Sequence, residues 1–298
     1  EYRMEVHMDE VLHEFELPDD KNSDEYRPVR EEKKPLVIEF HGIMIDLLKK
    51  KVEECEDLPQ QEEVLATNQG KNEDKSQKPW KWTEAEINEA TNWINSPLNR
   101  VRFLRARCWD LNAASQLMID AVSWRRTFQG KGVTHITAEE IQNELKTGKA
   151  FLHGYDKQNR PISYVKASLH DNSTRDIDEI QKFCVFLMEK EAANFKEGAY
   201  RSCIVFDLGG FALRNMDYTF MQFMIHMLQN YYPDTLGVAL ILNSPWLFSG
   251  CWAILKRWID PVSQKKVNFI NAEQLSDFIH PEHILKEYGG LDSWQYDP

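Results

Sequence analysis

The sequence lacks both a long apolar run and an excess of positive charge. A helix that crosses a bilayer needs about 20 consecutive apolar residues, and the most apolar stretch, residues 244–266, turns basic from Lys256 onward. The formal net charge is −12, and there is no basic stripe of the kind that binds a phosphate backbone. We therefore expect no membrane-spanning helix and no nucleic-acid partner.

Cysteine pairs are missing as well. The five cysteines form no C-x-x-C motif and leave one over, which argues against a disulfide framework and favours a reducing compartment. We therefore expect a cytoplasmic location. Because the chain begins with Glu1 rather than methionine, the sequence leaves open whether a targeting signal precedes it.

The short motifs of common enzymes are absent. There is no G-x-S-x-G elbow, no G-x-x-x-x-G-K-[ST] loop and no H-E-x-x-H motif. His280 and His283 are spaced like a metal pair, but no cysteine or carboxylate partner is indicated, so two surface histidines are favoured. Asp207 ends a strand as a catalytic acid would, but a turn before Gly209 and Gly210 is favoured. The sequence predicts neither an enzyme nor a metal site.

The negative charge is concentrated in residues 1–79, which carry −10 of the net −12. Residues 53–79 lack periodicity and are rich in polar side chains, which predicts a linker. Residues 35–50 are strongly apolar and must pack on a partner that the sequence does not specify. We interpret residues 1–79 as an acidic, partly disordered region, and residues 1–50 as a candidate binding segment for a protein partner.

The remainder of the chain changes its pattern near residue 150. In residues 80–150, Thr83 and Glu86 form a capping box, and apolar side chains recur at helical spacing from Ala114 to Phe128, which predicts a helical subdomain. In residues 151–298, apolar runs alternate with helical patterns, which predicts an α/β domain with a mostly parallel sheet. The expected strands are 162–165, 203–207, 238–243 and 267–270, and the expected helices are about 177–196, 216–230, 246–259 and 273–287.

Residues 245–259 predict a helix with an unusually wide apolar face. At about 100° per residue, its apolar side chains cover an arc of about 160°, whereas a surface helix needs about 100°. The arc contains Leu247, Phe248, Cys251, Trp252, Ile254, Leu255, Trp258 and Ile259, while Lys256 and Arg257 lie outside it. Burial against the sheet explains such a helix, and so does contact with a membrane interface, where tryptophan and basic residues are favoured.

A second helix start follows at Asp260 and Pro261, which have the features of an N-cap and a first helical residue. Ser263 and Lys266 then lie three residues apart on one face. A hydroxyl, an ammonium group and free helix N–H groups suit a phosphate. Simple capping with a solvated lysine is the alternative.

Six motifs together resemble the CRAL-TRIO lipid-binding family, and most closely its fungal phosphatidylinositol transfer branch. They are RFLRARCWDLNAASQLMIDAVSWRR, GYDKQNRPISY, IVFDLGGF…NMDY, YYPDTLGVALILNSPWLF, DPVSQKKV and EYGG, which run in order through about residues 83–292. The resemblance implies a helical subdomain followed by an α/β domain with a deep lipid cavity and a mobile gate helix. The gate falls on residues 245–259, and the resemblance implies that Trp246, Leu247, Phe248, Trp252, Leu255, Lys256, Arg257 and Trp258 contact the membrane.

The resemblance also implies a headgroup site for phosphatidylinositol. The family's arginine, glutamate, hydroxyl and lysine fall on Arg107, Asp234, Ser263 and Lys266, while a further lysine is replaced by Cys108. Cations for the phosphodiester, a hydroxyl and a carboxylate for the inositol are thereby kept. A salt bridge within the helical subdomain is the alternative role for Arg107.

The family's phosphatidylcholine site matches less well. Its two tyrosines fall on Leu152 and Ser163, its serine is kept as Ser202, and its threonine is Ile204. These positions lose polar anchors and gain apolar surface, which favours a second ligand without choline, such as an isoprenoid, a sterol or a fatty chain.

The sequence therefore predicts a non-enzymatic protein that takes up one lipid and transfers it between membranes. The expected ligands are phosphatidylinositol and a second apolar lipid, with no cofactor other than the bound lipid and with transient, peripheral contact to membrane surfaces. A regulatory module that binds a lipid and anchors a partner without bulk transfer stays open, and so does a hydrolase with an unrecognised nucleophile.

Overall fold

The computed structural model describes residues 31–61, 80–196 and 199–298. These residues form two compact units, which divide between Gly132 and Val133. The predicted division at residue 150 differs from this one. Residues 133–147 belong to the second unit because their short helices pack on α8 (Ile177–Ala193). Glu179 of α8 accepts hydrogen bonds from the backbone N–H groups of Asn143 and Glu144. The partly disordered region and the linker predicted for residues 1–79 fall largely outside the described residues.

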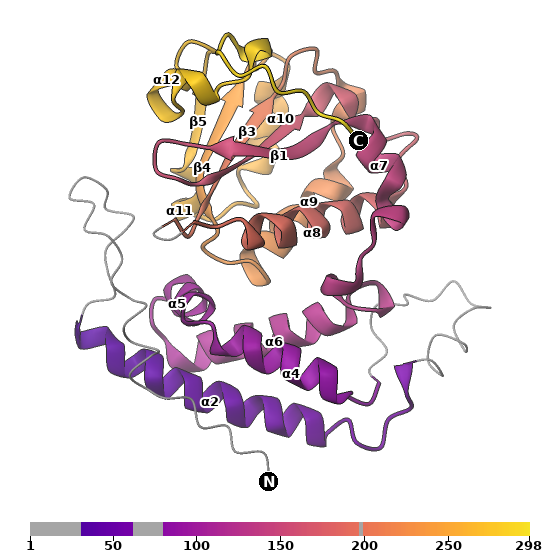
Figure 1. Ribbon diagram of the computed structural model, residues 1–298, viewed down its shortest axis with the longest axis vertical. Helices are drawn as coiled ribbons and strands as arrows, with labels where there is room; N and C mark the ends of the chain where they lie inside the picture. The colour runs from indigo at the N-terminus through magenta and orange to yellow at the C-terminus, as the bar shows by residue number, and fades with distance from the viewer. Residues whose placement is uncertain (1–30, 62–79, 197–198) are drawn as a thin grey trace. The chain divides into compact units, whose positions relative to one another are not determined.

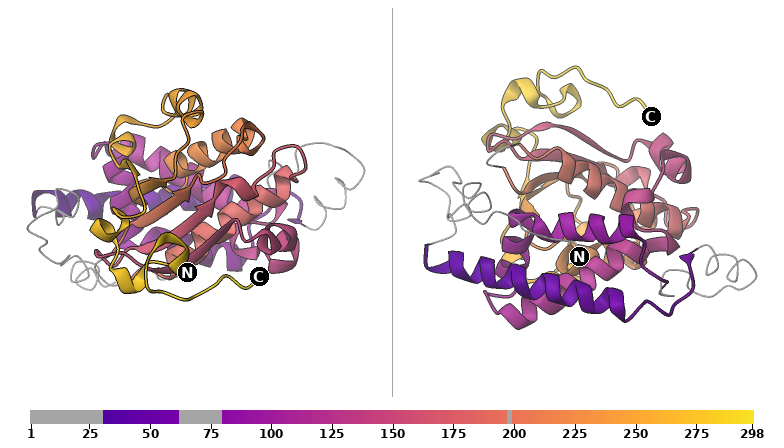
Figure 2. Two further views of the ribbon diagram at one scale, coloured as in Figure 1. Left: turned by 90° about the horizontal axis from the view of Figure 1, so that it is seen from above. Right: turned by 60° about the horizontal axis from the view of Figure 1, so that its bottom comes forward.

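The first unit is helical and answers the question raised by residues 35–50. Its helices are α2 (Lys34–Glu53), α4 (Glu84–Asn95), α5 (Pro97–Ala106) and α6 (Leu111–Thr127). Helix α2 buries Val37, Phe40, Met44 and Leu48 along one face and packs on α4, α5 and α6 (Figure 2). The apolar segment is therefore part of the helical unit's own core.

Local signals set the ends of these helices. The capping box at Thr83 is confirmed, because Glu86 N–H donates to Thr83 Oγ1 and Thr83 N–H donates to Glu86 Oε2. Arg126 connects α6 to the start of α4. Its guanidinium lies 4.5 Å and 4.3 Å from the ring centroids of Trp80 and Trp82 and 3.1 Å from Glu86. This combination of stacking and charge pairing anchors the chain before α4 to the helical core.

The second unit contains a five-stranded sheet in the order β1-β2-β3-β4-β5 (Figure 1). The strands are β1 (Ala150–Tyr155), β2 (Pro161–Lys166), β3 (Ser202–Asp207), β4 (Leu236–Leu242) and β5 (Val267–Ile270). Only β1 is antiparallel to its neighbour, so the expected mostly parallel sheet is confirmed. Strand β1 was not predicted, because His153 and Gly154 interrupt its apolar pattern and its register shifts between Leu152 and Tyr155.

The helices of this unit follow the predictions except at two places. They are α7 (Gln142–Thr147), α8, α9 (Tyr218–Asn230), α10 (Phe248–Leu255), α11 (Pro261–Gln264) and α12 (Leu275–Phe278). Helix α10 is shorter than the helix predicted for 246–259, and the prediction of one helix over 273–287 is wrong. After α12 the chain is extended at Ile279, and Pro281 starts a separate 3₁₀ turn, since its ring cannot continue a helix.

Short 3₁₀ helices fill several of the connections. They are Glu31–Lys33, Phe128–Gly130, Val133–His135, Ala138–Ile141, Ala167–Leu169, Leu213–Asn215, Pro281–His283 and Lys286–Tyr288. Such pieces are common as connectors between longer elements.

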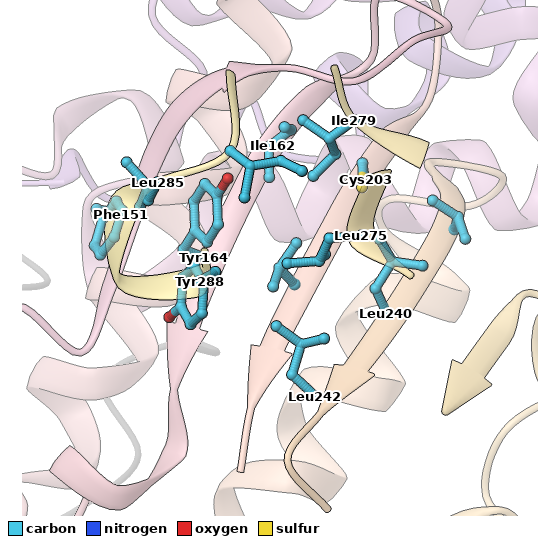
Figure 3. Close-up of a cluster of buried hydrophobic side chains, with 13 residues drawn as sticks. Phe151, Ile162, Tyr164, Cys203, Leu240, Leu242, Leu275, Ile279, Leu285 and Tyr288 are labelled. Atoms are coloured by element: carbon cyan, nitrogen blue, oxygen red, sulfur yellow. The ribbon is translucent and has the colours of Figure 1, made fainter. Parts of the chain in front are cut away.

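One face of the sheet is closed by the C-terminal segment (Figure 3). Ile162, Tyr164, Cys203 and Val205 alternate along β2 and β3 and are fully buried there. Leu275, Ile279, Ile284, Leu285 and Tyr288 cover this face. Helices α9 and α10 pack on the opposite face, against Phe206 and Ile241. The functional candidates of this unit lie on this second face and along the amino-terminal edge of the strands.

Candidate functional site

Three charged residues lie just before the parallel strands: Arg201 directly before β3, Asp234 two positions before β4 and Lys266 directly before β5. Because parallel strands begin at the same edge of a sheet, their side chains meet there. Arg201 Nη2 lies 2.6 Å from Asp234 Oδ1, and Lys266 Nζ lies 3.8 Å from the same oxygen. All three side chains are largely buried. We call these three residues the edge cluster.

Local backbone structure holds the edge cluster in place. Asp234 follows Pro233 with a φ of 54°, a left-handed conformation that aspartate tolerates better than most residues. Lys266 Nζ also donates to the carbonyl oxygen of Leu236 at 2.6 Å. This bond draws the ammonium group across the start of β4.

The helix start at Asp260 is confirmed. Asp260 Oδ1 accepts from the N–H groups of Val262 and Ser263 at 2.9 Å. Burial alone would raise the pKa of Asp260, but hydrogen bonds from the Ser263 hydroxyl and from these two backbone groups hold that pKa below its usual range. Ser263 and Lys266 are also linked, since Lys266 N–H donates to the Ser263 carbonyl at 3.1 Å.

The predicted headgroup residues are therefore distributed over both units. Asp234 and Lys266 meet in the edge cluster, and Ser263 lies one turn before Lys266. Arg107 caps the C-terminus of α5 in the helical unit, where its Nη1 donates to the Ala106 carbonyl. Within the described residues Arg107 forms no ion pair, so the alternative of a salt bridge in the helical unit is not seen. Arg201 was missed, although its place directly before a strand was visible in the sequence.

The predicted gate separates into a buried and an exposed side. Phe248, Cys251 and Leu255 pack into the core beneath α10, and the Phe248 ring lies edge-on to Phe211 at 5.4 Å. In contrast, Trp246 is 88% exposed and Ile254 is 41% exposed. The wide apolar arc is thus only partly used in packing.

The other predicted gate residues lie between these extremes or in solvent. Leu247, Trp252 and Trp258 are half-buried, and the Trp252 ring lies 5.4 Å from Phe269. Lys256 and Arg257 are exposed and form no ion pair with the residues that the structure describes. The exposed side of α10 and of the residues flanking it therefore carries both apolar and basic side chains, as an interfacial segment does.

The sheet face toward α8, α9 and α10 is packed less tightly than the opposite face. Val165, Ile204 and Phe206 point to this side of two central strands, yet they are only half-buried. On the helices above them, apolar side chains are also half-buried. They include Phe186, Leu187 and Met188 of α8 and Phe220, Met221, Phe223 and Met224 of α9. Several apolar side chains on this side of the sheet are thus less completely buried than those on the opposite face.

A buried carboxylate lies beside this surface. Glu191 of α8 is 2% exposed, and it accepts hydrogen bonds from Ser163 Oγ at 2.5 Å and Ser202 Oγ at 2.6 Å. The two serines come from β2 and β3, where Ser163 is paired with Ile204. Of the predicted cavity residues, Ser163, Ser202 and Ile204 therefore share one region, while Leu152 lies on the neighbouring strand β1 opposite Ser163. Glu191 was missed, because only the fold brings α8 over these strands.

Asp207 and the pair His280 and His283 were the weaker candidates in the sequence, and the structure shows how each is placed. Asp207 Oδ1 accepts from Gly209 N–H and from Asn243 Nδ2, both at 2.8 Å, which is a turn. The rings of His280 and His283 lie 6.3 Å apart. Across residues 31–61, 80–196 and 199–298, no group of three metal-binding side chains is found. In the same segments no helix is long and apolar enough to cross a membrane.

Comparison with known protein families agrees with this architecture. Residues 145–290 match the family model of the CRAL/TRIO domain. The chain therefore carries a CRAL/TRIO domain, as the sequence motifs predicted. A solved structure titled "Crystal structure of Sfh5" has the same fold, with a TM-score of 0.55 at 17% identity, over 86% of this chain and 90% of that chain.

Among known proteins, several fungal relatives are similar. The chain is 36% identical to the CRAL-TRIO domain-containing protein C3H8.02 of Schizosaccharomyces pombe, over 66% of this chain and 46% of the relative. It is 35% identical to the phosphatidylinositol transfer protein CSR1 of Eremothecium gossypii, over 66% and 48%. It is 25% identical to the phosphatidylinositol transfer protein PDR17 of Saccharomyces cerevisiae, over 72% and 64%. The chain thus spans about half the length of the first two relatives.

Proposed function

We propose that the protein binds a single lipid between its sheet and helices α8 to α10 and transfers it between membranes. Phosphatidylinositol is one ligand and a second, apolar lipid is the other. The contrast between the two faces of the sheet carries this proposal. One face is fully packed, while the other keeps accessible apolar side chains and ends at the edge cluster. The names of the relatives CSR1 and PDR17 support the same function.

The edge cluster has the chemistry that an inositol phospholipid headgroup needs. Arg201 and Lys266 supply two cations for a phosphodiester, so Arg201 compensates for the lysine that Cys108 replaces. Asp234 retains acceptor capacity for inositol hydroxyls, because a carboxylate has about four lone-pair sites. Ser263, one turn before Lys266, completes the proposed headgroup set within this unit, and a role for Arg107 of the helical unit stays a prediction from the resemblance.

Transfer requires that the lipid never enters bulk water. A diacyl lipid carries about 30 methylenes at about 0.8 kcal/mol each, so free release would cost roughly 20 kcal/mol or more. Exchange therefore takes place against a bilayer, with α10 as the gate. Ile254 of α10 and the exposed Trp246 before it enter the interface, while Lys256 and Arg257, which follow α10, meet anionic headgroups. The protein acts from the cytoplasm as a peripheral membrane protein, and no bond is made or broken.

Vesicle-to-vesicle transfer of labelled lipids tests this function. The wild-type protein should move phosphatidylinositol efficiently and phosphatidylcholine poorly, because Leu152, Ser163 and Ile204 offer no cage for choline. The double variant Asp234→Ala/Lys266→Ala should lose phosphatidylinositol transfer. The matched control is Lys166→Ala/Glu287→Ala, which removes a 2.7 Å ion pair at the opposite end of β2. Undiminished transfer by the edge-cluster variant would refute the headgroup assignment.

Mass spectrometry of the lipid that co-purifies with the protein identifies its ligands directly. A bound lipid without any transfer between vesicles would instead favour a regulatory module that presents lipid to a partner. Efficient phosphatidylcholine transfer would contradict the predicted ligand preference.

A further inference from the structure

The second ligand has a recognisable polar site in the contact between Ser163, Ser202 and Glu191. Both serines donate their hydroxyl hydrogen to the Glu191 carboxylate, at 2.5 Å and 2.6 Å. A carboxylate only accepts hydrogen bonds, and a serine hydroxyl carries a single hydrogen. The hydrogen of Ser163 is therefore committed to Glu191, and its remaining capacity toward any other group consists of oxygen lone pairs.

Ser163 is also the least buried member of this group. Glu191 and Ser202 are buried, whereas Ser163 is half-buried. It belongs to the loosely packed face of the sheet, where its β3 partner Ile204 and its β2 neighbour Val165 are half-buried too. The neighbours of Ser163 on this face are thus apolar, and its hydroxyl offers them only oxygen lone pairs.

We propose that Ser163 makes this site selective for a lipid whose polar end is a hydrogen-bond donor, namely an alcohol or an amine on an apolar body. The inference rests on the proposed lipid-binding function and specifies its second ligand. A ligand ending in a ketone, an ester or an ether places its oxygen against the lone pairs of Ser163, and the site rejects it. A buried acceptor that has no donor, or that faces another acceptor, costs free energy. The site therefore discriminates strongly against ligands that end in an acceptor alone.

Competition binding with ligands of matched skeleton tests the proposal. The probe is a pyrene-labelled fatty alcohol, displaced by 2-octadecanol, by 2-octadecanone or by octadecane. For the wild-type protein we expect 2-octadecanol to bind on the order of tenfold more tightly than 2-octadecanone. Octadecylamine, added as a further competitor, separates an amine preference from an alcohol preference. Equal affinities for the alcohol and the ketone would overturn the proposal.

Three variants test whether Ser163 and Glu191 cause the preference for the alcohol. Ser163→Ala should abolish the preference for the alcohol, while Ser163→Thr, which keeps the hydroxyl on a strand position that suits a β-branched residue, should retain it. Glu191→Met frees the hydroxyl hydrogen of Ser163, so binding of the ketone should improve relative to the alcohol. A preference that persists unchanged in Ser163→Ala or in Glu191→Met contradicts the assignment.

Phosphatidylinositol transfer, measured with the same preparations, distinguishes a failure of the second-ligand proposal from a failure of the proposed function. Circular dichroism verifies that each variant is folded, and phosphatidylinositol transfer is measured for the wild-type protein, whose edge cluster and cavity are both intact. A wild-type protein that transfers phosphatidylinositol but shows no preference for the alcohol would refute only the second-ligand proposal. A wild-type protein that neither binds the probe nor transfers phosphatidylinositol would refute the proposed function itself.

Discussion

Gly237 in β4 lies directly against the side chain of Arg160, the residue that precedes β2. A Cβ atom at position 237 would lie 2.8 Å from both Cδ and Nη1 of Arg160 and 3.0 Å from the Ser202 carbonyl oxygen. Arg160 in turn donates from Nε to Asp156 Oδ2 at 2.6 Å, and both residues are buried. A glycine in this strand thus lets a buried ion pair cross the amino-terminal edge of the sheet.

Gly237→Ala should therefore destabilise the protein by about 1–3 kcal/mol, the usual range for overpacking a filled site. Denaturant unfolding followed by circular dichroism measures the change. The control is Gly250→Ala in α10, where no atom lies within 4 Å of the added Cβ. That substitution should leave stability unchanged or raise it by up to about 1 kcal/mol. Equal effects at both positions would contradict the steric account.

Arg201→Gln should weaken phosphatidylinositol transfer by roughly tenfold, because it removes a cation from the edge cluster and one partner of Asp234. Arg201→Lys keeps the charge but loses the guanidinium geometry, so an intermediate rate is expected. The measurement is the initial rate of transfer between vesicles. Transfer that is insensitive to Arg201→Gln, in a folded protein, would remove Arg201 from the headgroup site.

Trp246→Asp and Ile254→Asp should reduce vesicle binding and slow lipid transfer by roughly tenfold, since each removes apolar surface from the proposed interface. Both residues are exposed, so the fold should be retained. Phe248 is a poorer choice, because it is buried in the core beneath α10. Leu291→Asp is the matched control, because Leu291 is 69% exposed in the C-terminal segment that covers the other face. Co-sedimentation with vesicles of phosphatidylserine and phosphatidylcholine measures binding. An equal loss of vesicle binding in all three variants would argue against a specific gate.

His170 should make the free energy of unfolding decrease in acid. Burial and the neighbouring Lys149, whose Nζ lies 3.2 Å from Nδ1, lower the pKa of His170 below that of an ordinary histidine, while Asp217 opposes this shift. Arg175, which pairs with Asp217 at 2.7 Å, also lowers it. Below the unfolded-state pKa the unfolded chain then binds more protons than the folded protein, so stability present at neutral pH is lost as the pH falls.

Urea unfolding at about pH 7.5 and about pH 5.5 measures this loss. The difference between the two pH values should be smaller in His170→Asn than in the wild-type protein. Part of the dependence should remain, because burial also lowers the pKa of His41 in the helical unit. A larger difference in the variant would contradict the sign derived for His170.

Short-range patterns in the sequence were sufficient for much of the fold. The capping box at Thr83, the helix start at Asp260 and the strand 267–270 are observed where the pattern places them, because each depends on neighbouring residues alone. The prediction of a helix over 273–287 was wrong for the opposite reason. Leu275 and Ile279 are apolar because this segment covers the sheet, and that spacing resembles a helical face.

The residues of the candidate site also fall into those that the sequence identified and those that only the fold revealed. Its motifs identified Asp234, Ser263 and Lys266, because the resemblance assigns a role to single positions along the chain. Tertiary structure alone added Arg201 and Glu191. Arg201 meets Asp234 only through the parallel register of β3 and β4, and Glu191 meets Ser163 only because α8 lies over the sheet. Contacts between residues about 30 positions apart depend on how strands and helices pack, and no local pattern in the chain encodes that packing.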